Sequence, residues 1–278
     1  MRSCSQMTIL ILNSLATEQG GSSMSDHKPK YFFWKAISVW LIAIGAMYLV
    51  DAFGEHIRLN DMLQNIYRGL VLFGILLLLN WLFIHQKVGW KPSLTIFNAL
   101  LLGIPTYLFV CYVTYIGSQQ LHLDYDWPFA ISVGLAAGPF EEYLCRGLLL
   151  GLLLKTFNRH SKVTQIWMAV LISSLLFGLL HAINLSYQSL NTTILQMISA
   201  CLGGVFYSAV YLRTGTILMA MIVHGLWDFI LNLVRPSLFN IPVALTGAIV
   251  IADVLEILIS IFYLRKSKIR TIQLEKLT

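Results

Sequence analysis

Long apolar runs separated by short polar segments dominate the chain from residue 32 onward. The runs cover residues 32–50, 69–84, 94–116, 127–154, 163–185, 192–212, 216–234 and 241–264. Most are long enough to cross a hydrocarbon core about 30 Å thick as a helix rising about 1.5 Å per residue. The pattern therefore predicts an all-α fold, a polytopic transmembrane helical bundle of about eight spans. The second run is short and Gly138-Pro139 interrupts the fourth, so the sequence defines the ends of these two spans poorly.

The charged residues between the runs predict how the bundle is oriented. Lysine and arginine near span ends are retained on the cytoplasmic side of a membrane. Alternate segments are rich in them: Lys28, Lys30, Lys35, Lys87, Lys91, Lys155, Arg159, Lys162, Arg213, Arg265, Lys266, Lys268, Arg270 and Lys276. The opposite segments contain Arg58, Arg68 and Arg235 beside several acidic residues. We therefore expect a multi-pass protein of the plasma membrane with both termini in the cytoplasm.

The composition excludes an ordinary soluble domain. Hydrophobic residues make up 57% of the chain and charged residues 12%, whereas soluble domains carry about 25% charged residues. The net charge of +6 lies in short segments between apolar runs and in the C-terminal tail, so we expect no nucleic-acid partner. The 4 cysteines show no close pairing, which predicts neither a disulfide framework nor a thiolate metal site.

No linker divides the chain into separately folded units, so we divide it by its apolar runs. Residues 1–30 are expected to be an N-terminal cytoplasmic segment, in which Met24 resembles a natural start and the preceding residues an over-extended translation. Residues 31–126 hold the first three spans, 127–234 the polar core, and 235–278 the last span with a basic tail.

Ionisable residues inside the runs are few, and each is a candidate for function because charge is costly in lipid. The fourth run contains Glu141, Glu142 and Arg146. Proline suits the first turn of a helix, so we expect a helix to restart at Pro139 with both glutamates in its first turn. The helix dipole would favour negative charge at that position.

The spacing of these charges assigns them different roles. Glu142 and Arg146 are four residues apart, so they share a helix face and can form an ion pair that is structural. Glu141 points about 100° away and is left free for chemistry. The alternative is an inert buried triad that only fixes helix packing.

Histidines on later runs complete a polar set. His224 and Asp228 are four residues apart on one helix face, and His181 is the ionisable residue of its own run. A lone histidine is often a packing residue. Together with Glu141, the two imidazoles suit hydrolysis, with the carboxylate as general base for water and an imidazole assisting it or binding a metal. His224 with Asp228 can stabilise an oxyanion.

Asp253 and Glu256 lie three residues apart in the last run. We favour a structural role for both. Cation binding, the lining of a water-filled cavity and a position near the membrane surface are alternatives.

These motifs carry a resemblance to a known family. Glu141-Glu142-x-x-x-Arg146, Phe177-x-x-x-His181 and His224-x-x-x-Asp228, in this order on successive runs, resemble those of the CPBP family. This family, also called Abi, contains CAAX proteases and bacteriocin-processing proteins and is related to the type II CAAX prenyl endopeptidases. The resemblance covers residues 127–234 and implies an intramembrane endopeptidase. It implies that Glu141 and His181 activate water, while His224 and Asp228 bind the oxyanion or complete the site.

The resemblance leaves the cofactor open. Glu141, His181 and His224 would be zinc ligands if the enzyme is a metalloprotease, and a metal-free, glutamate-dependent mechanism is the alternative. Asp228 stands where CAAX-processing members have asparagine, which favours a ligand or a protonated acid at that position.

Expected partners are a peptide or membrane-protein substrate and the lipid bilayer, while the oligomeric state is left open. Because the compact chain resembles bacterial members, bacteriocin processing or self-immunity is favoured over cleavage of prenylated substrates. The competing functions are a non-enzymatic membrane immunity protein and a proton- or cation-coupled transporter.

Overall fold

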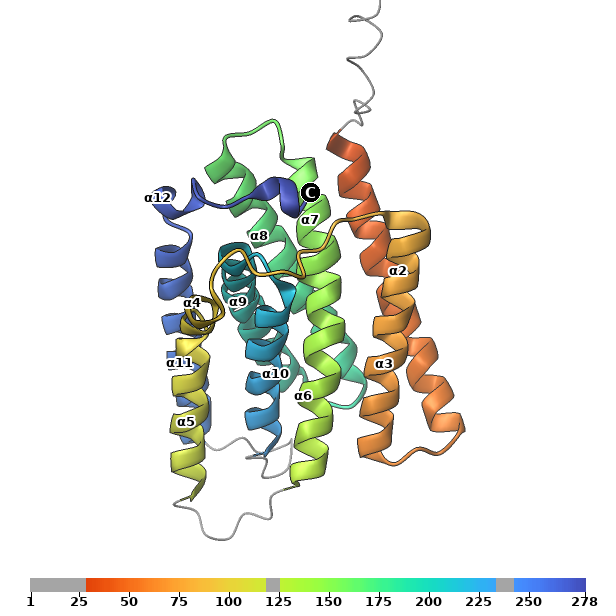
Figure 1. The fold of residues 1–278 in the computed structure, drawn as a ribbon. Helices are drawn as coiled ribbons and strands as arrows, with labels where there is room; N and C mark the ends of the chain where they lie inside the picture. Colours follow the sequence, from red (N-terminus) through yellow and green to blue (C-terminus); the bar gives the residue numbers. More distant parts are fainter. Residues whose placement is uncertain (1–28, 119–125, 234–242) are drawn as a thin grey trace, which may run out of the picture.

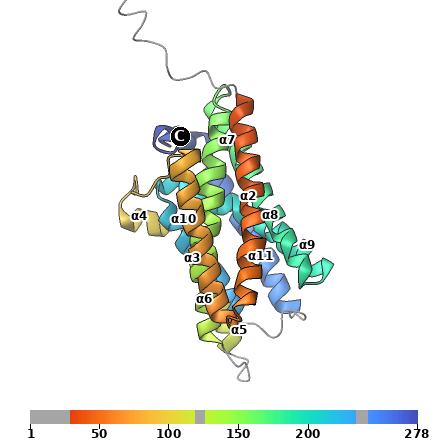
Figure 2. The same cartoon turned by 90° about the vertical axis from the view of Figure 1, so that its right-hand side faces the viewer.

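The computed structural model describes residues 29–118, 126–233 and 243–278, and every regular element in these ranges is helical. Figures 1 and 2 show the long helices side by side in one elongated bundle. They are α2 (Pro29–His56), α3 (Asp61–Leu79), α5 (Ile104–Ser118), α6 (Trp127–Glu142), α8 (Lys162–Leu180), α9 (Leu190–Thr214), α10 (Ile217–Leu233) and α11 (Val243–Tyr263). Short helices are α4 (Ile96–Leu101), α7 (Leu150–Thr156) and α12 (Lys266–Ile269). The predicted all-α fold is confirmed.

The helices identify an integral membrane protein. Among the described residues, 4 helical segments are long and apolar enough to cross a membrane, namely Pro29–His56, Asp61–Ile84, Lys162–Ser186 and Leu190–Thr214. Ile217–Leu233 is a shorter apolar helix. These segments do not confirm the predicted count of about eight spans. Large apolar side chains such as Leu49 and Trp81 are exposed on the outside of the bundle, as lipid-facing residues are.

Two predicted runs differ from the helices that form. The run 69–84 is not short, because α3 begins at Asp61, where the Asn60 side chain accepts a hydrogen bond from the Leu63 amide. It continues through the π-helical segment η1 (Asn80–Ile84). The run 94–116 is not one helix, because α4 ends at Leu101 and α5 begins at Ile104. Pro105 then occupies the first turn of α5, where a missing N–H costs nothing.

The prediction that a helix restarts at Pro139 was wrong. Helix α6 passes through Pro139 and ends at Glu142, and the chain continues as a π-helical segment, η2 (Tyr143–Leu149), into α7. A proline is tolerated inside a membrane helix when neighbouring helices support the freed backbone groups. Glu141 and Glu142 therefore lie at the C-terminal end of α6, and the argument from a helix N-terminus does not apply to them.

Glycines bring α6 and α10 into backbone contact. A Cβ atom added at Gly134 would lie 2.5 Å from the Gly225 carbonyl oxygen, and one at Gly138 would lie 2.7 Å from that of Met221. Small residues permit such close approach between membrane helices. The contact places the end of α6, with its two glutamates, directly against the part of α10 that carries His224.

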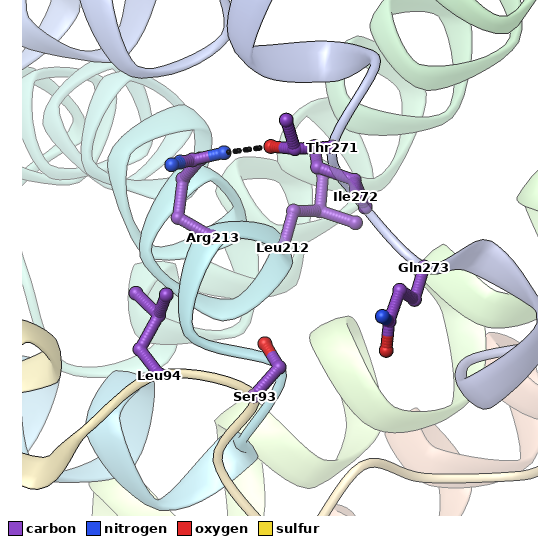
Figure 3. A pocket seen from close by; sticks show the side chains of 7 residues that line it. All are labelled: Ser93, Leu94, Leu212, Arg213, Thr271, Ile272 and Gln273. Carbon is purple, nitrogen blue, oxygen red and sulfur yellow. Dashed lines mark hydrogen bonds between the residues drawn. The ribbon is translucent and has the colours of Figure 1, made fainter.

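The C-terminal segment packs across one end of the bundle, the end at which α2 begins (Figures 1 and 2). Lys162 donates a hydrogen bond to the Ile272 carbonyl at 2.6 Å, and Gln86 donates one to the Leu277 carbonyl at 2.6 Å. Arg213 of α9 donates to the Thr271 hydroxyl at 3.0 Å, beside a small pocket that Figure 3 shows. The side of the membrane that this end faces stays a prediction, and the expectations for residues 1–28 fall outside the described residues.

Candidate active site

A buried carboxylate, Glu142, connects two of the predicted motifs. Its Oε1 atom accepts a hydrogen bond from Arg146 Nη1 at 2.7 Å and lies 2.8 Å from His224 Nδ1. The Glu142 side chain is 0% exposed and that of Arg146 1%. The predicted ion pair between Glu142 and Arg146 is therefore present, but its carboxylate also holds the histidine of α10. The sequence did not predict this second contact.

Aromatic rings enclose the Arg146 guanidinium. Its central carbon lies 4.5 Å from the ring centre of Phe177 on α8 and 5.2 Å from that of Tyr207 on α9. Such cation–π contacts stabilise a positive charge that has left water. Arg146 thus joins η2 to α8 and α9 at the centre of the bundle.

Two further carboxylates face the other nitrogen of His224. Asp228 Oδ2 lies 3.4 Å from Nε2, as the four-residue spacing predicts, and Glu141 Oε2 lies 3.9 Å from it. The Glu141 side chain is 17% exposed, whereas that of Glu142 is fully buried. Oε2 of Glu141 and Oε2 of Glu142 both have no hydrogen-bond partner among the described residues. The two glutamates differ because Oε1 of Glu142 holds Arg146 and His224, whereas Glu141 is partly exposed.

His181 lies where α8 ends, at the first residue of the 3-10 segment η3 (His181–Ser186). Its Nδ1 is 3.0 Å from the Phe177 carbonyl oxygen. Because a carbonyl only accepts, Nδ1 carries the hydrogen, and in the neutral imidazole Nε2 is then the nitrogen that accepts. The Phe177 ring lies between the two histidines, with its centre 5.1 Å from that of His181 and 5.5 Å from that of His224, so the α8 motif lies beside the histidine of α10.

Comparison with known families agrees with this geometry. Residues 123–230 match the family model described as type II CAAX prenyl endopeptidase Rce1-like. The chain carries an Rce1-like family domain. The matched residues include the three motifs named from the sequence, but not Asp253 and Glu256. The family implies that the protein is a protease. No curated protein and no solved structure matches the chain.

The described residues of the Rce1-like domain show no preformed metal site. Across residues 29–118, 126–233 and 243–278, no group of three His, Cys, Asp or Glu side chains is arranged to hold an ion. His224 Nδ1 is occupied by Glu142, and His181 Nδ1 by a carbonyl oxygen. The zinc ligand set of Glu141, His181 and His224 is therefore not confirmed.

The tertiary structure adds a residue that sequence reasoning missed. Tyr207 of α9 stacks on His224. It belongs to no motif of the Rce1-like domain as read from the sequence. Its relation to the site comes from helix packing, so no spacing along the chain could have revealed it.

The acidic pair of the last helix lies outside this motif set. Asp253 Oδ1 accepts a hydrogen bond from Ser199 of α9 at 2.9 Å. Glu256 is buried, and a Cβ atom added at Gly203 of α9 would lie within 3.6 Å of both Glu256 Oε2 and the ring of Tyr207 that stacks on His224. Glu256 therefore lies behind the site, on the α9 and α11 side of His224.

Proposed function

We propose that the chain is an intramembrane endopeptidase in which Glu141 is the general base. The observation that supports this role is the contrast between the two glutamates. Glu142 is fully buried and its Oε1 is committed to Arg146 and His224, whereas Glu141 is 17% exposed and its Oε2 lies 3.9 Å from His224 Nε2 without a hydrogen-bond donor. A carboxylate in that state can accept a proton from a water molecule as the water attacks a peptide carbonyl.

His181 assists the same water in this proposal. Its Nδ1 hydrogen is held by the Phe177 carbonyl, so the free Nε2 can accept a hydrogen bond from the water. The 3-10 turn after α8 holds the ring at the end of the helix. Glu141 and His181 then orient the nucleophile from two different helices, which lowers the entropic cost of the attack.

His224 stabilises the developing oxyanion in this proposal. Both of its ring nitrogens face carboxylate oxygens, Glu142 at Nδ1 and Asp228 at Nε2, an arrangement that suits the doubly protonated imidazolium. In this form the Nε2 hydrogen can turn from Asp228 to the oxyanion, where a preorganised donor contributes most. Asp228 is then an acceptor that orients His224, which explains how aspartate can replace the asparagine of CAAX-processing relatives.

We propose peptides or membrane-associated protein segments as substrates, with bacteriocin processing or self-immunity as the biological setting. The family takes its name from prenylated CAAX proteins, so a prenylated CAAX peptide should be tested as a substrate beside the others. A transporter would place its polar groups along the depth of the membrane. Here Glu141, Glu142 and Asp228 all lie within 4 Å of one imidazole, which favours a single reaction site.

The test is cleavage of a peptide library by the purified, detergent-solubilised protein. Glu141→Gln keeps the shape of the side chain and removes its basicity, so we expect cleavage to fall about 100-fold or more. Asp253→Asn is the matched control, because it neutralises another buried carboxylate of the bundle, one that is hydrogen-bonded to Ser199. Equal cleavage by wild type and Glu141→Gln would contradict the proposal.

A strong chelator added in parallel decides the cofactor. Loss of cleavage that Zn²⁺ restores would establish a metalloprotease. Cleavage that persists in the chelator would establish the metal-free, glutamate-dependent mechanism.

A further inference from the structure

Tyr207 lies flat against the imidazole of His224. The two ring centres are 4.7 Å apart and the ring planes differ by 17°. Tyr207 is 2% exposed and comes from α9, a helix that contributes no residue to the three sequence motifs. The contact therefore joins a fourth helix to the site formed by α6, α8 and α10.

The contacts around His224 constrain the ring in two different ways. Glu142 at Nδ1 and Asp228 at Nε2 fix the direction in which the nitrogens point. They leave the tilt of the ring loosely defined, because the terminal torsion of histidine has a broad energy minimum. Tyr207 covers a face of the ring, and Phe177 meets it edge-on at 5.5 Å and 82°. The aromatic contacts thus set the plane of the imidazole.

We propose that Tyr207 is a positioning residue for the hydrolytic reaction, holding the His224 ring in the plane from which Nε2 addresses the oxyanion. This inference rests on the proposed function. A misplacement of about 1 Å in a catalytic group can cost about 100-fold in rate. Tyr207 would therefore act on the chemical step, with little effect on substrate binding.

The contacts with His224 and Arg146 are made by the ring of Tyr207. A Cβ atom added at Gly203 would lie 3.5 Å from the Tyr207 hydroxyl and 3.6 Å from Glu256 Oε2, so the hydroxyl lies on the side of the buried carboxylate of α11. Tyr207→Phe removes the hydroxyl and keeps the ring, so it separates the two contributions.

Phe206 provides a matched control on the same helix. It is fully buried, like Tyr207, but its ring packs near Tyr263, with ring centres 6.4 Å apart. Phe206→Leu therefore removes an aromatic ring from the same region without uncovering His224. A general loss of packing would affect Phe206→Leu and Tyr207→Leu alike.

The experiment measures kcat and KM for the full-length protein in detergent. We expect Tyr207→Leu to lower kcat about 10- to 100-fold at nearly constant KM, and Tyr207→Phe and Phe206→Leu to stay within about threefold of wild type. Should Tyr207→Leu not fold, Tyr207→Met replaces it, since its volume is closer to that of tyrosine. A folded Leu or Met variant with wild-type kcat, or an equal loss in Phe206→Leu, would overturn the proposal.

A second readout does not require activity. Diethyl pyrocarbonate modifies imidazoles that are accessible and unprotonated, so a looser hold on His224 raises its reactivity; mass spectrometry gives the rate at His224 relative to exposed His85. We expect this ratio to rise severalfold in Tyr207→Leu and to stay unchanged in Phe206→Leu. An unchanged ratio in Tyr207→Leu would overturn the positioning role. If the wild-type protein cleaves no peptide, the proposed function is refuted. If the ratio still rises in Tyr207→Leu and not in Phe206→Leu, the positioning of His224 by Tyr207 is supported all the same.

Discussion

The buried pair of Glu142 and Arg146 predicts a large and specific effect of removing one charge. In Arg146→Met the carboxylate of Glu142 stays buried and keeps the contact with His224 at 2.8 Å, but loses the one with Arg146 at 2.7 Å. Breaking a buried ion pair costs about 3–5 kcal/mol because an uncompensated charge remains. We expect about 3 kcal/mol here, the lower end, because His224 still meets the carboxylate and methionine fills the space between two aromatic rings.

The assay is thermal unfolding of the purified protein in detergent, followed by the helical circular dichroism signal. A loss of about 3 kcal/mol corresponds to a Tm lowered by roughly 6–12 °C. The double variant Glu142→Gln with Arg146→Met should recover most of this loss, because no buried charge is left unpaired. Arg213→Met is the control, since this partly exposed arginine makes hydrogen bonds but no ion pair among the described residues.

Two results would refute the reasoning. An Arg146→Met protein that melts within about 2 °C of wild type would show that the pair contributes little. A double variant less stable than Arg146→Met alone would show that the cost does not arise from the buried carboxylate.

Further predictions concern helix packing and orientation. Gly138→Ala places a Cβ atom 2.7 Å from the Met221 carbonyl oxygen, so α10 must move away from α6. We therefore expect a lower Tm and a lower kcat. The control is Gly45→Ala, whose Cβ atom meets nothing within 4 Å and which should match wild type. In a cysteine-free variant, a membrane-impermeant maleimide added to intact cells should label Asn60→Cys but not Ser267→Cys, as the distribution of lysine and arginine predicts. Labelling of Ser267→Cys from outside would reverse the predicted orientation.

The structure changes the role that the sequence suggested for Glu142. Spacing along one helix pairs it with Arg146 and assigns it to structure. The tertiary contact with His224 makes the same oxygen a support for an imidazole of the site. A loss of activity in Glu142 variants would therefore combine lower stability with a misplaced His224, and the two effects are separated by comparing kcat with Tm.

The sequence by itself determined the class of the molecule and most of its polar set. Long apolar runs require helices, because backbone groups in lipid must be satisfied within the segment. Charge is costly in lipid, so Glu141, His181, His224 and Asp228 were identifiable from one chain. Local spacing also predicted the pairing of Glu142 with Arg146, since residues four apart share a helix face.

Only the tertiary structure decided how these groups meet. The continuous α6 and the π-helical turn at its end depend on support from neighbouring helices, which a local proline rule cannot include. The contacts of His224 with Glu142 and Tyr207 join α10 to α6 and α9. Such contacts follow from which glycines let helices approach and from which faces then pack together. These contacts join segments that are distant in the sequence, so the pattern of residues within any one segment cannot predict them.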